Sequence, residues 1–460
     1  MVSKAWRVRF APSSKALPPT GRDSTKEVTF DSPAVRQHAR SKSACRECRL
    51  RRVKCDERYP VCRHCERRGV VCNPAPRNTT WKLELPLLIQ QACSRDGTAP
   101  SMLLQYYFEQ VCHIMVLDPE INPLALPLLD LFKESSALLH VVQSIAAAHR
   151  DGFSNSSTRE CLVERKRTLS SIQKELSKAR KRPVPTFLAI FLLGISSPWI
   201  EGNMGLEHLV GARAIIDLIL DDPAAIPSDP AIQLIVGIYI WWEMAASFNL
   251  EHQLHKPLAT DFISKAVQAS RIEYHPLAGY SLEMFYMVAN VTHYCRGILD
   301  GELRDFALEA RLEDEMLAWT PSRDDELLLL LSDAYRKHGL IQLHRICGPG
   351  LEQSQQGNER MIQQWASEAM DSLLQIPLTS PYLNFQPIPL LSAASEIPSH
   401  KLEQREEVKL RFKAIYSLNR LPVMLDAIAL LEEIWELRRV GITTLWLVIL
   451  LERGQVFPLA

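Results

Sequence analysis

Hydrophobic residues from about position 101 onward recur at three- and four-residue spacing, the period of a helix with one buried face. The pattern is clear in residues 101–118 (SMLLQYYFEQVCHIMVLD) and 135–150 (SSALLHVVQSIAAAHR). Residues 157–181 carry a longer and more charged version of it, which ends before Pro183 and Pro185. Further helices are predicted near residues 186–197, 205–220, 229–247, 280–298, 325–346, 358–375, 402–417 and 424–452.

Patterns typical of β-strands are nearly absent, and the 460 residues contain only 18 glycines. We therefore predict a mainly α chain in which residues 101–460 form a large all-α domain. No internal repeat of about 34 or 40 residues is visible, so a regular solenoid is not expected. The longest apolar runs, such as residues 232–242 (IQLIVGIYIWW), are shorter than the ~18–20 residues of a membrane-spanning helix. They are interpreted as buried helices, and no membrane partner is expected.

The first 100 residues differ from the rest of the chain in charge. The chain has 53 basic and 53 acidic residues, but residues 1–100 contain 21 Lys/Arg and 9 Asp/Glu. This asymmetry is typical of a polyanion-binding end joined to a body with another role. Residues 1–41 lack apolar periodicity and are predicted to be a disordered basic arm. Residues 74–100 are predicted to be a linker, with a short helix at LELPLLIQQ (83–91) and no sustained coiled coil.

Six of the eleven cysteines lie between these two segments, in residues 42–73. They are Cys45, Cys48, Cys55, Cys62, Cys65 and Cys72. Each half follows the same rule, Cys-x2-Cys-x6-Cys, so the segment is an internal duplication. No secretory signal is expected at the N-terminus, and a dense cysteine cluster then indicates metal rather than disulfides. Each half offers three thiolates whereas tetrahedral zinc takes four, but two ions are satisfied if one cysteine of each half bridges both.

The alternative zinc sites fit less well. RING, LIM and zinc-ribbon sites recruit histidine or use eight ligands in pairs, and His64 is the only local histidine. The segment instead resembles the fungal binuclear zinc cluster, Zn(2)-Cys(6), DNA-binding domains. The resemblance rests on all six cysteines, on the basic run after Cys48, on Lys54-Cys55-Asp56 and on Pro60, two residues before the fourth cysteine.

This resemblance implies two Zn²⁺ ions per chain and a particular ligand arrangement. The first and fourth cysteines, Cys45 and Cys62, bridge the two ions. The terminal ligands are Cys48 and Cys55 for one ion, and Cys65 and Cys72 for the other. The peptide bond before Pro60 is expected to be cis.

Four basic residues between the second and third cysteines are the candidate DNA contacts: Arg49, Arg51, Arg52 and Lys54. The second half has Gly69, which ends its helix early, so the first half is the predicted recognition element. Arginine can bond both the O6 and N7 acceptors of guanine in the major groove. By resemblance, Arg51 and Arg52 read a CGG triplet, although many family members have lysine at the second position. Arg49 and Lys54 are assigned to phosphates, which position a protein without specifying sequence.

The predicted all-α domain resembles a second known family, and its sequence contains none of the common enzyme motifs considered below. Residues 103–150 resemble the second type of fungal-specific transcription factor domain, which implies an all-α regulatory region that senses effectors or contacts co-regulators. The chain has no GxSxG, P-loop or Rossmann glycine motif. Neighbouring cysteine and histidine residues, at 112–113 and 293–295, are interpreted as core or boundary residues, because near neighbours on a helix point apart. Trp241 and Trp242 are interpreted as core packing rather than as a ligand pocket. We predict no catalytic residue and no enzymatic activity.

These observations favour a nuclear transcription factor for RNA polymerase II genes that binds double-stranded DNA at CGG-type half-sites. The regulated genes are expected to form a metabolic or secondary-metabolite gene cluster, and transcriptional co-regulators are expected partners. A homodimer formed through the body and a monomer both stay open. The alternative is a zinc-dependent interaction scaffold that binds RNA or protein. A steep dependence of duplex binding on salt, with a preference for CGG, distinguishes the first hypothesis.

Overall fold

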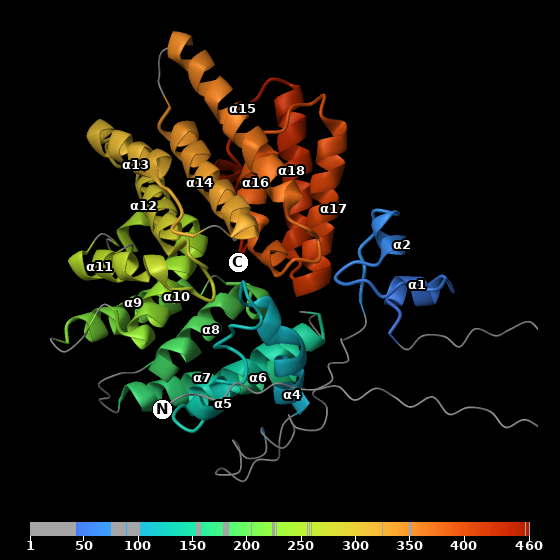
Figure 1. Cartoon of the computed structure of the whole chain (residues 1–460), viewed down its shortest axis with the longest axis vertical. Helices are drawn as coiled ribbons and strands as arrows, with labels where there is room; N and C mark the ends of the chain where they lie inside the picture. The colour runs from blue at the N-terminus through green and yellow to red at the C-terminus, as the bar shows by residue number, and fades with distance from the viewer. Residues whose placement is uncertain are drawn as a thin grey trace, which may run out of the picture. The chain divides into compact units, whose positions relative to one another are not determined.

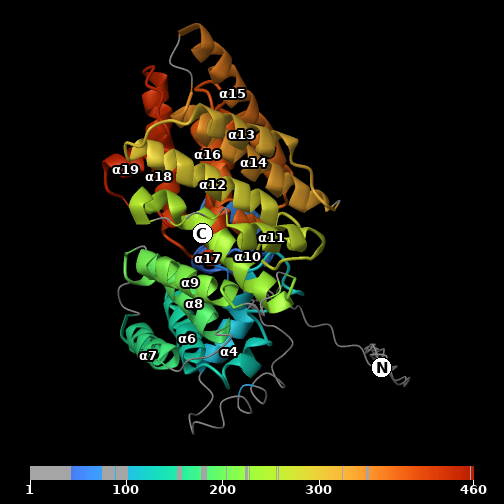
Figure 2. The ribbon, with the colours of Figure 1, turned by 90° about the vertical axis from the view of Figure 1, so that its left-hand side faces the viewer.

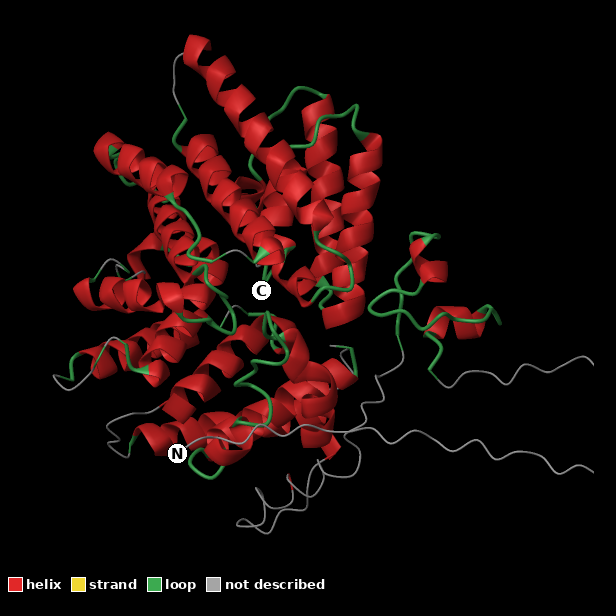
Figure 3. Cartoon of the chain, viewed as in Figure 1, coloured by secondary structure: helices red, strands yellow, loops and turns green. Residues whose placement is uncertain are grey.

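The computed structural model describes residues 43–74, Ile89 and residues 102–459, with gaps at 153–157, 178–183, 204, 223–225, 227, 255, 257, 259, 324, 349–351 and 456. The expected basic arm and all of the expected linker except residue 74 and Ile89 lie outside the described residues. Within the described part, helices and short loops make up the chain (Figure 3), and the one bridge of β type joins His275 to Gly279. The predicted mainly α fold is confirmed.

The first part of the body contains helices that pack on α6 and α8, beside one another in Figures 1 and 2. Their bounds are α4 (Met102–Tyr106), α5 (Leu128–Leu131), α6 (Ser136–Arg150), α7 (Thr158–Leu176), α8 (Val184–Ile200), α9 (Leu206–Leu220) and α10 (Pro230–Ala246). A π-helical turn over Tyr107–Val111 and a 3-10 turn over Cys112–Ile114 follow α4. Ser135 caps α6, because its hydroxyl accepts the Leu138 N–H at 3.1 Å.

The second part of the body is arranged around α14, which packs against α12, α13, α15 and α16. The helix bounds are α11 (Asp261–Ala269), α12 (Leu282–Leu299), α13 (Phe306–Ala318), α14 (Glu326–Ile346), α15 (Glu352–Gln375), α16 (Pro387–Ser395), α17 (Leu402–Asn419), α18 (Val423–Arg439) and α19 (Trp446–Glu452). Short 3-10 turns cover Ser247–Asn249, His252–Leu254, Ser270–Ile272 and Pro381–Phe385. No helix of the described residues is both long and apolar enough to cross a membrane.

Three differences from the sequence-based expectations have local causes. The single helix expected over 424–452 is two helices, because Gly441 has a φ of +86° and the chain turns before α19. Pro185 lies inside α8 instead of breaking the chain before it, since the first turn of a helix tolerates proline. For the same reason the PIPLL segment begins α16, which the sequence pattern did not predict.

The tryptophan pair on α10 packs in the core, as expected. Trp242 is buried, and a Cβ placed on Gly194 of α8 would lie 2.2 Å from its ring. Glycine at position 194 therefore allows α8 and α10 to approach closely. Trp241 also lines a cavity, which the sequence interpretation did not favour.

Buried histidines are expected to make the body sensitive to acid. Burial lowers the pKa of His275 and of His338 to about 4. In the unfolded chain the same groups take up a proton near pH 6.5, so the unfolded state binds more protons between about pH 6.5 and pH 4. Stability should fall with decreasing pH in that window, by up to ~1.4 kcal/mol per pH unit for each histidine.

Urea unfolding of the full chain at pH 7 and pH 5 measures this effect. A His275→Gln variant should lose part of the pH dependence. Its matched control is His400→Gln, which changes an exposed histidine. An equal pH dependence in the wild type and in His275→Gln would contradict the assignment.

Candidate metal centre and nucleic-acid interface

The cysteine segment folds as two similar turns that begin at cysteine. Helix α1 (Arg46–Leu50) starts after Cys45, and helix α2 (Arg63–Glu66) starts after Cys62. In each half the sulfur of the first cysteine accepts the backbone N–H of the second, with N···S distances of 3.3 and 3.4 Å. The cysteines therefore cap the helices and at the same time direct both thiols of a half to one side.

The two halves also close on each other. The Asp56 carboxylate accepts the backbone N–H of Arg63, at the start of α2, at 3.1 Å. The carbonyl of Asn73 accepts the N–H of Arg46, at the start of α1, at 3.0 Å. Both acceptors follow the third cysteine of their half directly. In each half the residue after the third cysteine therefore holds the first N–H of the other half's helix, through its side chain at Asp56 and through its backbone at Asn73.

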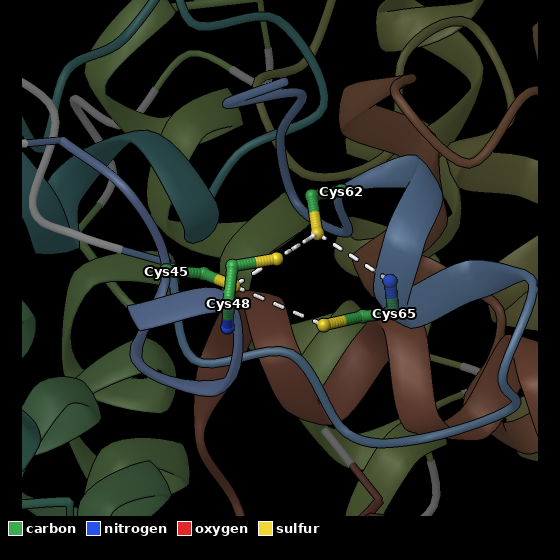
Figure 4. A group of neighbouring side chains, drawn as sticks. All are labelled: Cys45, Cys48, Cys62 and Cys65. Atoms are coloured by element: carbon green, nitrogen blue, oxygen red, sulfur yellow. Dashed lines mark hydrogen bonds between the residues drawn. The ribbon is translucent and has the colours of Figure 1, made fainter. Parts of the chain in front are cut away.

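The sulfur atoms meet between α1 and α2, and the four labelled cysteines of Figure 4 point toward one another. The Sγ separations are 3.8 Å for Cys45–Cys62, 3.8 Å for Cys45–Cys65 and 3.6 Å for Cys48–Cys62. A tetrahedral zinc site with Zn–S bonds of ~2.3 Å has sulfur–sulfur edges of about 3.8 Å. These three separations match the sulfur–sulfur edges of a zinc thiolate site, so the chemistry of the donor set fits zinc.

Cys45, Cys62 and Cys65 each belong to two groups of neighbouring donor atoms. All three share one group with Cys48; Cys45 and Cys65 are also grouped with Cys72, and Cys62 with Cys55. All six cysteines are buried. His64 is exposed and belongs to none of these groups in the described part of the chain.

The electrostatics of the cluster favour a cation. Burial, together with hydrogen bonds to neighbouring thiols, raises the pKa of Cys48 well above its usual range, and burial does the same at Cys65. Several thiolates this close repel one another unless positive charge lies between them. Zinc supplies that charge and binds the deprotonated form.

The end of α1 has an unusual backbone. Arg52 has a φ of +59°, and Gly69 occupies the equivalent position after α2 with a φ of +58°. The hydrogen bonds match as well, because Val53 N–H bonds Cys48 C=O and Val70 N–H bonds Cys65 C=O. This left-handed position after a helix favours glycine, and a residue with a Cβ is strained there. The first half thus keeps an arginine where the fold favours glycine.

The four predicted DNA-contact residues all lie on the surface. Arg49, Arg51, Arg52 and Lys54 are exposed at the end of α1 and in the turn after it. Leu50 is also exposed there, with 73% of its surface accessible. Leu50 was not among the predicted contact residues, although its place between Arg49 and Arg51 in the sequence indicates that it is exposed with them. An exposed leucine among basic residues suits contact with a thymine methyl group.

The peptide bond between Tyr59 and Pro60 is cis, as the resemblance implied. The cysteine–histidine neighbours of the body form no nucleophile pair in the described part. Cys112 is fully buried, donates to Phe108 C=O at 3.3 Å, and has its pKa raised by burial to about 12. His293 contacts Glu243 at 2.8 Å, and Cys295 is fully buried. Cys112, His293 and Cys295 are core residues and His113 is half-buried, which agrees with the interpretation as core or boundary residues.

The two parts of the chain match two different families of known domains. Residues 43–82 match the fungal Zn(2)-Cys(6) binuclear cluster domain, and residues 102–459 match the fungal specific transcription factor domain. No solved structure matches the chain.

Curated relatives match over short stretches. A Zn(2)-C6 fungal-type transcription factor, afumD, from Aspergillus fumigatus is 57% identical over 35 residues, 8% of this chain and 9% of that protein. The aurofusarin biosynthesis regulatory protein aurR1 from Gibberella zeae is 32% identical over 68 residues, 15% of this chain and 17% of that protein. The chain therefore matches less than a fifth of the length of either relative.

The cysteine cluster matches a class of zinc-binding modules that bind DNA. Both matched families are transcription factor families, which are a non-enzymatic class of proteins. The match over the body covers well over half of the chain. This chain belongs to the fungal specific transcription factor domain family, and its N-terminal part matches the fungal Zn(2)-Cys(6) binuclear cluster domain.

Proposed function

We propose that the chain recognises CGG-type half-sites in double-stranded DNA through its zinc module. The observation that carries this proposal is the exposed arginine run at the end of α1, which continues directly from a helix whose first turn is tied to the thiol cluster. Metal binding would hold this short helix in one orientation, since five residues do not form a stable helix alone. The arginine guanidinium groups at the end of α1 would then enter the DNA major groove from a helix of fixed orientation.

The proposed metal assignment is the one that the family resemblance implies. Two Zn²⁺ ions are held by six thiolates, with Cys45 and Cys62 as the bridging ligands. Cys48 and Cys55 complete one ion, and Cys65 and Cys72 complete the other. Support for a shared thiolate site comes from the separations near 3.8 Å between sulfurs of the two halves.

Arg51 and Arg52 are the proposed base contacts, and Arg49 and Lys54 the proposed phosphate contacts. The strained backbone of Arg52 supports its role in binding. Glycine at this position would remove the strain, and the arginine side chain is exposed to solvent, so packing does not explain why arginine is there. Residues 42–73 would then be the DNA-binding domain, residues 74–100 the linker, and residues 101–460 the regulatory domain.

An Arg52→Gly variant tests this role directly. The zinc module should keep its zinc and gain ~1 kcal/mol of stability, because glycine accepts the left-handed backbone without strain. Affinity for CGG-containing duplexes should fall by ~1–3 kcal/mol, the value of a lost bidentate base contact. Zinc content, thermal unfolding and titration of the full chain with labelled duplex measure the three quantities.

Arg52→Ala is the matched variant, since it removes the side chain but keeps the Cβ. It should lose the same DNA affinity without the gain in stability. If Arg52→Gly kept its full preference for CGG over unrelated duplexes, Arg52 would have no part in base recognition.

The wider role is regulation of RNA polymerase II genes in the nucleus, with the helical body passing regulatory input to co-regulators. The Gibberella zeae relative aurR1 is named as a regulatory protein of aurofusarin biosynthesis, which supports a metabolic gene cluster as the target. Selection from random duplexes with the full chain tests site preference. One enriched triplet indicates a monomer, and two at fixed spacing indicate a homodimer. Equal affinity for unrelated duplexes and single-stranded RNA would favour an interaction scaffold instead.

A further inference from the structure

Helix α17 of the body is hydrogen-bonded to the second half of the cysteine segment. The Lys413 ammonium group donates to the Gly69 C=O at 2.6 Å, and the Cys72 N–H donates to the Ser417 hydroxyl at 3.2 Å. The partners are 344 and 345 positions apart in the sequence, so only folding brings them together. Cys72 takes part through its backbone, which leaves its sulfur available to the thiol cluster. The two contacts are therefore additional to the proposed zinc and DNA sites.

The contact between Ser417 and Cys72 satisfies a backbone group that has no access to water. Cys72 is 0% exposed and Ser417 is 3% exposed. A buried N–H group costs free energy when it is left unpaired, so almost all such groups have a partner. The Ser417 hydroxyl donates its own hydrogen to the Lys413 C=O at 2.8 Å, which orients its oxygen to accept from Cys72. The side chain that satisfies the last cysteine of the module thus comes from the body.

Lys413 and Ser417 form a two-point contact because of their spacing on α17. Residues four positions apart lie on the same face of a helix, one turn from each other. On the module, Gly69 follows α2, and Cys72 lies three residues further along the same loop. The ammonium group meets a carbonyl and the hydroxyl meets an N–H, so each donor faces an acceptor. The two contacts therefore hold this loop at both of its ends.

The turn between the two halves of the module also faces the body. Tyr59 and Pro60 line one cleft together with His113 and Leu418 of the body. The arginine run at the end of α1 takes no part in these contacts. All four predicted DNA-contact residues are exposed, namely Arg49, Arg51, Arg52 and Lys54. The body thus contacts the module on surfaces other than the proposed DNA-binding one.

We propose that the Lys413–Ser417 face of α17 is a docking site for the chain's own zinc module, and that this docking slows the release of the zinc ion held by Cys65 and Cys72. The inference rests on the proposed two-ion zinc site. Cys72 lies at one end of the docked loop. Its sulfur therefore cannot leave the ion by a movement of this loop until its N–H bond to Ser417 breaks.

The restraint acts on one of the two ions. The hydrogen bonds that Cys48 and Cys55 make in the described part of the chain stay within the zinc module, so the other ion lacks this restraint. Docking and zinc binding also strengthen each other, because the coupling between two binding equilibria is reciprocal. Zinc fixes the shape of the Gly69–Cys72 loop, and α17 binds the loop in that shape. The body then presents the module to DNA with its arginine run uncovered.

A Ser417→Ala variant of the full chain tests the restraint. The wild type and the variant are loaded with zinc and placed in excess EDTA, and the zinc bound per chain is followed with time. In the wild type we expect a fast phase and a slow phase, one for each ion. In Ser417→Ala the slow phase should be about tenfold faster, the factor that corresponds to the loss of one hydrogen bond to a buried N–H group. The fast phase should be unchanged.

Lys413→Ala and Lys409→Ala are the companion variants. Lys413→Ala removes the second contact and should accelerate the slow phase in the same direction, which keeps the proposal testable if Ser417→Ala does not fold. Lys409 lies one turn earlier on α17 and pairs with Glu406 and Glu432 of the body. Lys409→Ala should therefore release zinc at the same rates as the wild type.

Hydrogen–deuterium exchange of the Cys72 amide tests the docking independently of zinc release. Peptides that contain Cys72 should exchange faster in Ser417→Ala than in the wild type or in Lys409→Ala, because the amide loses its acceptor. Affinity for CGG-containing duplexes should be the same in these three proteins, since the arginine run takes no part in the contact.

Several results would overturn the proposal. They are equal zinc release from the wild type and Ser417→Ala, equal exchange of the Cys72 amide in both, and a higher duplex affinity of Ser417→Ala, which would mean that docking covers the DNA-binding surface. A wild-type chain that binds no zinc would instead contradict the proposed function, and the exchange of the Cys72 amide would still decide whether the module docks on α17.

Discussion

Cys45→Ser is expected to release both zinc ions and unfold the zinc module, with loss of sequence-specific DNA binding. Cys45 lies within hydrogen-bonding distance of sulfurs from the other half, at 3.8 Å from both Cys62 and Cys65, and it also caps α1. If Cys45 bridges the two ions as proposed, its removal leaves each ion with three thiolate ligands instead of four. Structural zinc supplies ~10–16 kcal/mol of apparent folding free energy in modules of this size, so little structure should survive without it. Zinc per chain and duplex affinity measure the result.

Two controls make this result specific to a bridging ligand. Cys72→Ser changes a proposed terminal ligand and should leave one ion more firmly held than the other. Cys161→Ser changes a buried cysteine of α7 outside the cluster and should keep two ions per chain. Retention of two zinc ions by Cys45→Ser would refute the bridging assignment.

Glu396→Ala is expected to destabilise the body by ~3–5 kcal/mol, the cost of breaking a buried ion pair. Glu396 is fully buried after α16, and its carboxylate contacts Arg345 of α14 and Arg438 of α18. Arg345 also contacts Glu359 of α15 at 2.6 Å. Without Glu396, two guanidinium groups that are only 10% and 11% exposed would lose a shared counter-charge. Urea unfolding followed by circular dichroism measures the change in free energy.

Glu436→Ala is the matched control, because Glu436 pairs with Arg439 on the surface of α18. Both groups are mostly exposed, so solvent and salt weaken the pair and the unfolding midpoint should stay unchanged. Equal effects of the two substitutions would show that burial of Glu396 contributes nothing. Zinc content should be unaffected in both variants.

Much of the helical body was predictable, and the errors have a common origin. Long helices with apolar residues at regular spacing, such as α6 and α14, were expected within one or two residues of their observed bounds. Short helices such as α11 and α16 were not, because nine residues give too few turns for a clear period. Gly441 separates α18 from α19 through a backbone conformation that hydrophobic spacing does not reveal.

The sequence by itself determined the chemistry of the zinc module. Six cysteines at duplicated spacing specify a thiolate site, and the arginine run within it predicts a partner with phosphates and guanine acceptors, because these are properties of residue type and local spacing. Only the tertiary structure decided which sulfurs lie closest together, that Arg52 is strained, that Glu396 pairs with two arginines, and that Trp241 lines a cavity. Those features depend on distances between residues far apart in the chain, or on a backbone angle, and neither is encoded in the periodicity of hydrophobic positions.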